Sequence, residues 1–413
     1  MEPKRVHFVS LGCPKNRVDT ETMLAGLPGA RYTITPDADQ ADVVVVNTCA
    51  FVEEAKVESV DTILEMARKK ESGQVEKLVV TGCLSQRYPE ELARELPEVD
   101  HFVGTNDLNL VTEILDGRTG TRVVVGNPDR REFDWEAPRY NSMGGYMAYL
   151  KVAEGCSNKC AFCIIPTLRG PQRSRSIESI VAEAEALADQ GVVELNLIAQ
   201  DLTAYGYDHR PRSSLTRLLE KLVEVKGIRW IRLLYAYPRS FPKGLVEMLA
   251  SEEKLVPYVD MPIQHISDNV LKRMRRGTNG DTIRRRIGEL REQVPGLTLR
   301  TTLLVGYPGE TQEDFDQLLD FIRDARFERM GAFSYSREEG TPSHDLDQQL
   351  PQSVRTARLE ELMYTQRSIA RAHNQAWIGR EVDVLVEKRS TESDLVWVGR
   401  IAQQAPEIDG VTY

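Results

Sequence analysis

The chain has 413 residues, 41% of them hydrophobic, a size and composition that predict two or three domains with substantial cores. No stretch approaches about 18 consecutive apolar residues, which argues against a membrane span. The formal net charge of −10 argues against a general nucleic-acid binder, although local basic patches could still act. The N-terminus runs directly into a strand-like segment with no signal region, so we expect a cytoplasmic protein with reduced thiols.

The first part of the chain alternates short β-branched runs with helical patterns. Strands are expected at residues 6–11, 42–47 and 77–81, with helices such as 52–70 and 88–96 between or after them. This alternation predicts a parallel sheet covered by helices, which we assign to an N-terminal α/β domain of residues 1–125.

Cys13, Cys49 and Cys83, called the strand-end cysteines below, each follow one of these strands by one or two residues. The carboxyl ends of parallel strands share one edge, where open α/β sheets bind ligands, so we expect the three thiols to converge. Gly12 and Gly82 precede two of them and would let the backbone approach a bulky group. A single cysteine after a strand is usually a small buried hydrophobe, but three in equivalent positions favour a ligand set.

Residues 126–145 lose this periodicity and gain proline, glycine and charge, which indicates a linker. From residue 146 to residue 375, strands and helices alternate again. The expected strands lie at 146–152, 193–199, 230–236, 258–263, 298–305 and 330–335, and the expected helices at 177–190, 215–225, 244–250, 282–293 and 313–324. Successive βα units that stop short of eight predict a partial TIM-type barrel, open on one side.

A C-x3-C-x2-C pattern formed by Cys156, Cys160 and Cys163, the loop cysteines, follows the first strand of this barrel. Barrel enzymes keep their chemistry at that face. Three thiolates ligate three irons of a cubane cluster and leave the fourth iron open to another ligand. Structural zinc would need a fourth ligand, and disulfides would need an oxidising compartment. The two cysteine triplets therefore predict a redox enzyme with two iron-sulfur centres.

The last segment, residues 376–413, predicts a small β domain. Strands are expected at 381–386 and 395–400, alternating like an antiparallel pair. The chain stops at Tyr413, inside this expected domain, so we expect the domain to be truncated. From Gly379 onward, four Lys or Arg stand against seven Asp or Glu, the wrong sign for gripping a phosphate backbone.

At this point the sequence resembles a known family. The loop cysteines after the first strand of a βα barrel resemble the radical S-adenosylmethionine (SAM) superfamily, and the strand-end cysteines before them resemble its methylthiotransferases. Several segments are similar to the branch that methylthiolates an aspartate of ribosomal protein uS12, namely residues 10–16, 155–166, 169–170, 173–175 and 197–201. The tRNA-modifying branch usually carries Gly-Gln-Asn where this chain has Ala199-Gln200-Asp201.

The resemblance implies a transferase with two 4Fe-4S clusters that uses two SAM molecules per turnover. A cluster on the loop cysteines would bind SAM and deliver the electron that yields a 5'-deoxyadenosyl radical, which removes hydrogen from the unactivated β-carbon of the aspartate. A cluster on the strand-end cysteines would hold the sulfur to be transferred, methylated by the first SAM. No side chain is assigned a catalytic role, because the cofactors carry the chemistry.

The same resemblance implies partners and a domain name. Residues 146–375 would be the radical SAM core and residues 376–413 a β domain of the TRAM type. We expect uS12, free or in the small subunit, as the substrate, a low-potential electron donor such as flavodoxin or ferredoxin, and a separate sulfur source. Nucleic acid is not the expected substrate.

Candidate SAM contacts lie at other strand ends of the barrel. Gln200 and Asp201 close the second barrel strand and could hydrogen-bond the methionine part of SAM, or form a polar pair that faces solvent. Arg175 could pair with the SAM carboxylate through its planar fork, or be a surface arginine.

Two further segments carry weaker signals. Gly306 to Glu310 resembles the glycine-containing SAM contact of the superfamily, although a Gly-Pro-Gly run is also an ordinary turn. His265 ends the fourth strand and could line the same face, or be a satisfied core or rim histidine.

Two other functions stay open from the sequence. The basic runs 272–276 and 284–286 allow tRNA methylthiolation, although charge runs on helices are usually solvated faces. A non-catalytic iron-sulfur electron carrier would hold clusters without cleaving SAM.

Overall fold

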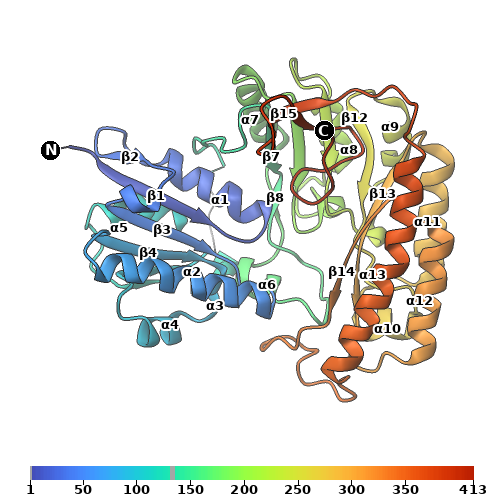
Figure 1. The fold of residues 1–413 in the computed structure, drawn as a ribbon, viewed down its shortest axis with the longest axis horizontal. Coiled ribbons are helices and arrows are strands. Elements are labelled where there is room, and N and C mark those ends of the chain that lie inside the picture. Colours follow the sequence, from blue (N-terminus) through green and yellow to red (C-terminus); the bar gives the residue numbers. More distant parts are fainter. Residues whose placement is uncertain (1, 131–134) are drawn as a thin grey trace. The chain divides into compact units, whose positions relative to one another are not determined.

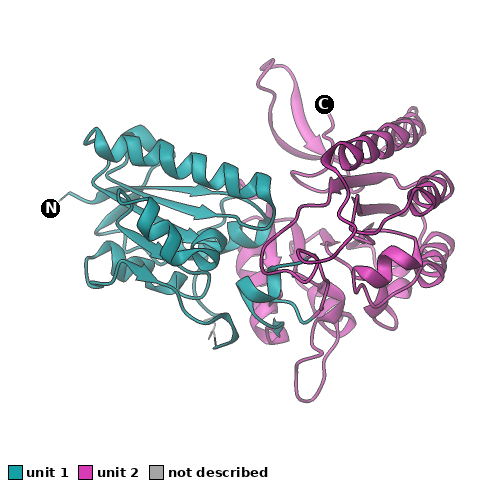
Figure 2. Ribbon diagram, turned by 90° about the horizontal axis from the view of Figure 1, so that it is seen from below, with its two compact units in different colours: residues 1–142, 154–157, 163–173 teal, residues 143–153, 158–162, 174–413 magenta. Residues whose placement is uncertain are grey.

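The computed structural model describes residues 2–130 and 135–413. The chain forms two compact units, which are coloured separately in Figure 2. The first unit comprises Met1–Ser142, Glu154–Ser157 and Cys163–Arg173, and the second comprises Met143–Ala153, Asn158–Phe162 and Ser174–Tyr413. Within the expected linker, residues 131–134 lie outside the described residues, and the expected domain boundaries stay predictions.

The first unit is built on a six-stranded parallel sheet in the order β2-β1-β3-β4-β5-β6, of which Figure 1 labels β1 to β4. The strands are β1 (Lys4–Ser10), β2 (Tyr32–Ile34), β3 (Val43–Thr48), β4 (Lys77–Gly82), β5 (His101–Val103) and β6 (Val123–Val124). All six residues of β3 are buried, as expected for a central parallel strand covered on both faces. The three predicted strands are confirmed, whereas β2, β5 and β6 are too short to give a periodic signal.

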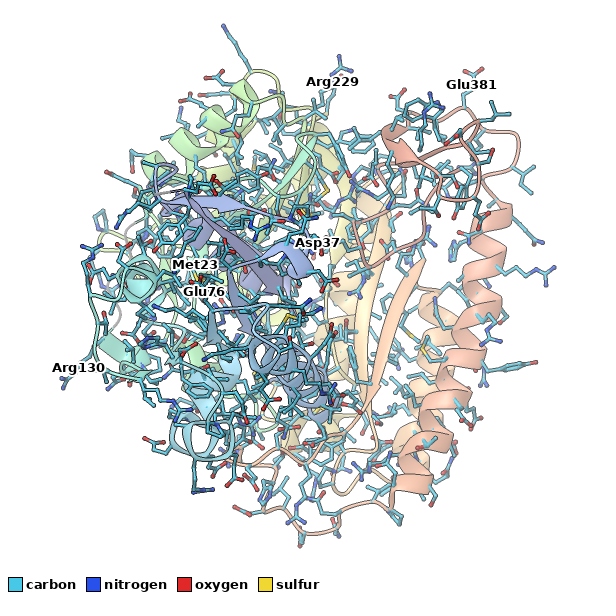
Figure 3. All side chains as sticks on the ribbon, turned by 60° about the vertical axis from the view of Figure 1, so that its left-hand side comes forward. Met23, Asp37, Glu76, Arg130, Arg229 and Glu381 are labelled. Carbon is cyan, nitrogen blue, oxygen red and sulfur yellow. The ribbon has the colours of Figure 1, made fainter. Side chains whose placement is uncertain are left out.

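Helices cover both faces of this sheet because side chains alternate along each strand. Val44 and Val46 pack with Ile63 in one apolar layer, while Val43 and Val45 pack with residues that include Met23, labelled in Figure 3, in the other. The helices of the unit are α1 (Pro14–Ala25), α2 (Glu53–Glu71), α3 (Cys83–Arg87), α4 (Pro89–Glu95), α5 (Val111–Leu115) and α6 (Ile165–Arg169), with short 3-10 turns η1 (Ala38–Gln40), η2 (Leu108–Leu110) and η3 (Pro128–Arg130).

The second unit contains a six-stranded parallel sheet in the order β14-β13-β12-β11-β10-β7. Its strands are β7 (Met147–Lys151), β10 (Glu194–Ile198), β11 (Trp230–Leu233), β12 (Leu255–Asp260), β13 (Thr298–Val305) and β14 (Arg329–Ser334). Since β7 and β14 are the two edges, the sheet is an open barrel, as predicted. The short strands β8 (Ala153–Glu154) and β9 (Arg173–Ser174) stand where the chain passes between the units.

Helices pack against the outer face of the barrel strands. Leu195 and Leu197 of β10 belong to the same apolar core as Leu218, whereas Glu194 and Asn196 alternate with them along the strand. The helices are α7 (Ile177–Asp189), α8 (Leu215–Leu222), α9 (Leu245–Ser251), α10 (Asp268–Arg273), α11 (Gly280–Gln293), α12 (Gln312–Ala325) and α13 (Gln352–Gln375), with turns η4 (Leu202–Ala204) and η5 (Pro238–Ser240). Within the described ranges, none of the helices has the length and apolar character needed to cross a bilayer.

The C-terminal segment forms an antiparallel pair of β15 (Leu385–Arg389) and β16 (Trp397–Arg400). The predicted strand at 381–386 is therefore wrong in position by about four residues. Residues 381–384 alternate polar and apolar side chains, but the ladder with β16 begins only at Leu385, opposite Arg400. Glu381, labelled in Figure 3, is accordingly exposed and outside the strand.

Buried ion pairs connect this C-terminal segment to the barrel strands. The Glu194 carboxylate, at the start of β10, lies 2.9 Å from the Arg232 guanidinium of β11 and 2.6 Å from that of Arg400. All three side chains are buried. Burial alone would raise the pKa of Glu194, but the two arginines hold it below the usual value. Glu194 therefore stays ionised and joins β10, β11 and β16.

Replacing this carboxylate should destabilise the second unit. Glu194→Gln leaves the buried Arg232 guanidinium without its anion and Arg400 with Glu387 alone, so we expect a loss of about 3–5 kcal/mol in the free energy of unfolding at pH 7, read from the urea midpoint. Because the folded pKa of Glu194 is lowered, its contribution exists above the unfolded pKa of about 4.3 and is lost as pH falls. The difference between the variant and the parent should therefore shrink in acid.

The matched control for this prediction is Glu224→Gln, since Glu224 pairs with Lys221 on the exposed surface. It should change the free energy of unfolding by less than about 1 kcal/mol. Equal losses from the two substitutions would contradict the role of the buried network.

Candidate functional site

The strand-end cysteines converge at one edge of the sheet in the first unit. Cys13 precedes α1, Cys49 directly follows β3, and Cys83 directly follows β4 as the first residue of α3. Because β1, β3 and β4 are neighbours in the sheet, their carboxyl ends lie side by side. Burial raises the pKa of the Cys49 thiol, and the nearby Cys13 thiolate raises it further. The three thiols are thus close enough to influence one another.

Two glycines shape the turns that carry these thiols. Gly12 has φ +85°, and a Cβ there would lie 2.7 Å from the Cys49 Cβ. Gly82 has φ +97°, and a Cβ there would lie 2.3 Å from the Asn47 Oδ1. Side chains at either position would be strained and would collide with the neighbouring turn, so glycine is required for the cysteines to come together.

A buried arginine lies beside this cysteine group. The Arg169 guanidinium is 2.9 Å from the Asp19 carboxylate, 3.0 Å from the Glu154 carboxylate and 3.8 Å from the Cys83 Sγ. Burial disfavours its charge, but Glu154 and Asp19 overcome this effect and raise its pKa. Arg169 is therefore a permanent cation next to a thiol. Sequence reasoning noted Arg169 in a motif but assigned it no role, because its partners are distant in the chain.

The chemistry of these donors fits an iron-sulfur cluster. Burial raises the pKa of Cys83 to about 12, an effect that Arg169 opposes only in part, so a thiolate there calls for further positive charge. Thiolates are the ligands that hold the irons of such clusters, each binding a different iron. In the part of the chain that the structure describes, no group of three His, Cys, Asp or Glu is placed to share a single metal ion.

The loop cysteines are divided between the units. Cys156 and Cys163 belong to the first unit and Cys160 to the second, and all three are partly buried. In the second unit, the Cys160 Sγ accepts a hydrogen bond from the Arg276 Nη1 at 3.2 Å and lies 3.9 Å from the Tyr237 hydroxyl. Neither contact was foreseen from the sequence. The Arg276 N–H directed at this sulfur fits a thiolate ligand.

Asp201 is buried and braces the cysteine loop. Its Oδ2 accepts a hydrogen bond from the Asn158 Nδ2 at 2.7 Å, and its Oδ1 accepts one from the Thr203 hydroxyl at 2.7 Å. Burial raises its pKa, while these donors act in the opposite direction. The alternative of a polar pair facing solvent is wrong for Asp201, and the adjacent Gln200 is partly buried. A contact of either residue with SAM stays a prediction.

Arg175 is also inside the second unit. Its guanidinium donates to the Glu183 carboxylate, to the Ser179 hydroxyl at 2.9 Å and to the Lys151 carbonyl at 3.0 Å. The alternative of a surface arginine is therefore wrong, because only 3% of the residue is exposed. These contacts join β7 to α7, and a role of Arg175 toward SAM stays a prediction.

The turn after β13 is closed by a carboxylate. The Glu310 Oε2 accepts hydrogen bonds from the amides of Gly306 at 2.7 Å and Tyr307 at 3.1 Å, and its Oε1 accepts one from Arg358 at 2.7 Å. His265 is fully buried, and burial lowers its pKa to about 3. The core position of His265 is confirmed, although among the described residues only its Nδ1 has a hydrogen-bond partner, the Ser267 amide at 3.0 Å, while SAM contacts at Gly306 and Glu310 stay predictions.

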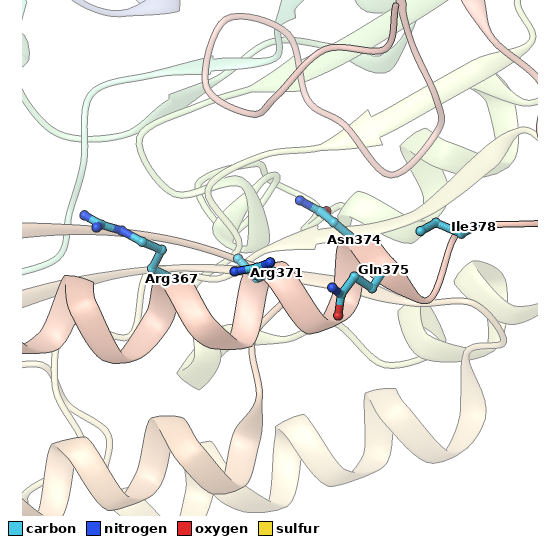
Figure 4. A pocket seen from close by; sticks show the side chains of 6 residues that line it. Arg367, Arg371, Asn374, Gln375 and Ile378 are labelled. Atoms are coloured by element: carbon cyan, nitrogen blue, oxygen red, sulfur yellow. The ribbon is translucent and has the colours of Figure 1, made fainter.

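One surface pocket lies on the outer helix α13 and has a volume of about 490 Å³ (Figure 4). Arg367, Arg371, Asn374, Gln375 and Ile378 are among the residues that line it. None of the cysteines or expected SAM contacts lines this pocket. It is therefore not the place of the predicted chemistry.

Three family models match successive parts of the chain. The uncharacterized protein family UPF0004 matches residues 5–104, the radical SAM superfamily residues 150–322 and the TRAM domain residues 378–413. In the solved structure of the radical SAM methyltransferase TsrM from Kitasatospora setae, the fold is similar with a TM-score of 0.62 at 17% identity, covering 83% of this chain and 77% of that one. The cobalamin-dependent radical SAM enzyme OxsB gives a TM-score of 0.57 at 13% identity over 89% of this chain and 56% of that one.

Relatives of high identity extend over nearly the whole chain. The ribosomal protein uS12 methylthiotransferase RimO of Anaeromyxobacter sp. (strain Fw109-5) is 54% identical over 100% of this chain and 88% of its own length. The proteins of the same name from Myxococcus xanthus and Geobacter sulfurreducens are 54% and 49% identical, over 86% and 92% of their own lengths and at least 99% of this chain. The chain therefore belongs to the RimO family of radical SAM methylthiotransferases.

Proposed function

We propose that this protein adds a methylthio group to the β-carbon of an aspartate in ribosomal protein uS12, using two 4Fe-4S clusters and two SAM molecules per turnover. The observation that carries the proposal is the convergence of Cys13, Cys49 and Cys83 at the ends of adjacent strands, in a chain that also has the loop cysteines after β7. The RimO relatives, named for uS12, supply the substrate.

The two cysteine groups have different tasks in this proposal. The loop cysteines hold the cluster that binds SAM, and the strand-end cysteines hold the cluster that carries the sulfur. When bound, the two clusters would supply the electron and the sulfur, and SAM would supply the radical and the methyl group. Removing hydrogen from an unactivated carbon lies beyond any side-chain base at pH 7, which is why the protein recruits such cofactors.

The residues of the chain hold the cofactors, fix the loops around them and balance their charge. Arg169 keeps a cation beside Cys83, and its two carboxylate partners keep it in place. Asp201 holds Asn158 and thereby restrains the loop between the first two loop cysteines. Glu310 fixes the turn after β13, whose segment we assign to SAM together with Gln200, Asp201, Arg175 and Gly306.

The reaction requires an electron donor and a sulfur source, and it implies a cellular location. A low-potential donor such as flavodoxin or ferredoxin supplies electrons, and a separate source supplies sulfur, since neither is part of the chain. A substrate on the small ribosomal subunit places the protein in the cytoplasm. We assign the N-terminal α/β domain to residues 1–125, the radical SAM core to 146–375 and the TRAM domain to 376–413. The acidic balance after Gly379 argues against tRNA as the substrate.

The first prediction of this proposal concerns iron content. Anaerobically reconstituted protein should bind about eight irons as two cubane clusters. Replacing the three loop cysteines by Ala should leave about half, and replacing the three strand-end cysteines should leave the other half. Iron and acid-labile sulfide analysis with EPR measures this. Stoichiometric zinc, or one cluster in the intact chain, would refute the assignment.

The second prediction separates the two groups by activity. The protein without strand-end cysteines should still cleave SAM reductively to 5'-deoxyadenosine, because its SAM-binding cluster is intact, but should transfer no methylthio group. The protein without loop cysteines should do neither. Chromatography of the nucleoside products measures both. SAM cleavage that depends on the strand-end cysteines instead would reverse the roles.

The third prediction concerns the substrate. Incubation with uS12, SAM, reductant and a sulfide source should place one methylthio group on one aspartate, located by tandem mass spectrometry. Isolated tRNA treated in the same way should stay unmodified. A methylthiolated adenosine together with unmodified uS12 would show that the substrate is tRNA. Bound clusters without any SAM cleavage would indicate an electron carrier.

A further inference from the structure

Arg276 holds an unusual position in the second unit. Its guanidinium is buried, with only 6% of the residue exposed, and within the described part of the chain it donates to a sulfur and a carbonyl rather than to a carboxylate: the Nη1 donates to the Cys160 Sγ at 3.2 Å and the Nη2 to the Pro262 carbonyl at 2.6 Å. A buried cation normally requires a paired anion. Of its two hydrogen-bond acceptors, the Cys160 sulfur is the one that can carry a negative charge, and the Asp201 carboxylate also interacts with the Arg276 charge.

The surroundings fix Arg276 in this orientation. The guanidinium carbon lies 4.2 Å from the centroid of the Tyr237 ring, a cation-π contact that sets its plane. The Tyr237 hydroxyl donates to the Arg276 carbonyl, and the Arg276 amide donates to the Leu271 carbonyl at 3.0 Å. These contacts fix both the backbone and the side chain of Arg276, so its guanidinium group stays directed at the sulfur.

Resting on the proposed function, we propose that Arg276 is a positioning residue that sets the reduction potential of the SAM-binding cluster through Cys160. Hydrogen bonds to cluster sulfurs and nearby charge are the means by which proteins set such potentials. Reduction adds one negative charge to the cluster, and a fixed cation at the ligand sulfur stabilises that state more than the oxidised one. Arg276 therefore makes the cluster easier to reduce by the electron donor.

The test is a redox titration followed by EPR in full-length protein whose strand-end cysteines are replaced by Ala, so that one cluster is observed. Arg276→Met should lower the ratio of reduced to oxidised cluster about tenfold at a fixed potential, a shift of about 59 mV to more negative values for a one-electron couple. Arg276→Lys keeps the charge but not the planar fork, so it should recover part of the shift.

The matched control is Arg239→Met, which removes an exposed arginine with the same change in net charge. It should leave the potential unchanged, because exposed charges are screened. Iron content and thermal midpoint are measured for each variant. If iron-loaded Arg276→Met has the same reduction potential as the parent, the inference is overturned. It is also overturned if Arg276→Met and Arg276→Lys lose iron equally and both have a lowered thermal midpoint, because that result would indicate a structural role.

The iron content of the parent protein distinguishes a failure of this inference from a failure of the proposed function. If the parent binds no cluster on the loop cysteines, the proposed function fails and this inference falls with it. If the parent is loaded and only the shift is missing, the inference alone fails and the proposed function stands.

Discussion

Parallel strand pairing is the constraint on which the candidate site depends. In a parallel sheet every strand ends at the same edge, so the residues that follow neighbouring strands meet even when they are distant in the chain. In the first unit this rule brings together Cys13, Cys49 and Cys83 after β1, β3 and β4. In the second unit it places Asp201 after β10 and Gly306 after β13 at the corresponding edge. Both units thus use one architectural rule to gather polar groups over a nonpolar core.

Buried charge is the second feature that the units share. In the first, Arg169 lies beside Cys83 and is balanced by Asp19 and Glu154. In the second, Arg276 lies beside Cys160. A buried ion without partners would cost several kcal/mol, so a buried arginine beside a cysteine favours the thiolate form of that cysteine. Thiolate ligands supply such charge, and this connects the electrostatics of the protein to the cofactors it is proposed to hold.

Sequence patterns predicted the parts of the structure that local periodicity and topology determine. The buried valine run 43–46 predicted β3, and the regular alternation after residue 146 predicted the open barrel. Partners brought together by folding were not predictable: Arg276 and Cys160 are 116 positions apart, and no local signal marks the pair. The burial of Arg175 was missed for the same reason. Near the C-terminus, alternation misplaced β15, because pairing with a short partner strand decided where it begins.

The central claim is that the two cysteine groups hold separate clusters and that SAM binds to an iron of only one of them. Mössbauer spectroscopy of protein reconstituted with isotopically enriched iron, recorded with and without SAM, tests this most directly. The account predicts that SAM changes the signal of a single iron site when only Cys156, Cys160 and Cys163 are present. It predicts no change when only Cys13, Cys49 and Cys83 are present. A change confined to the second protein, or identical changes in both, would contradict the account.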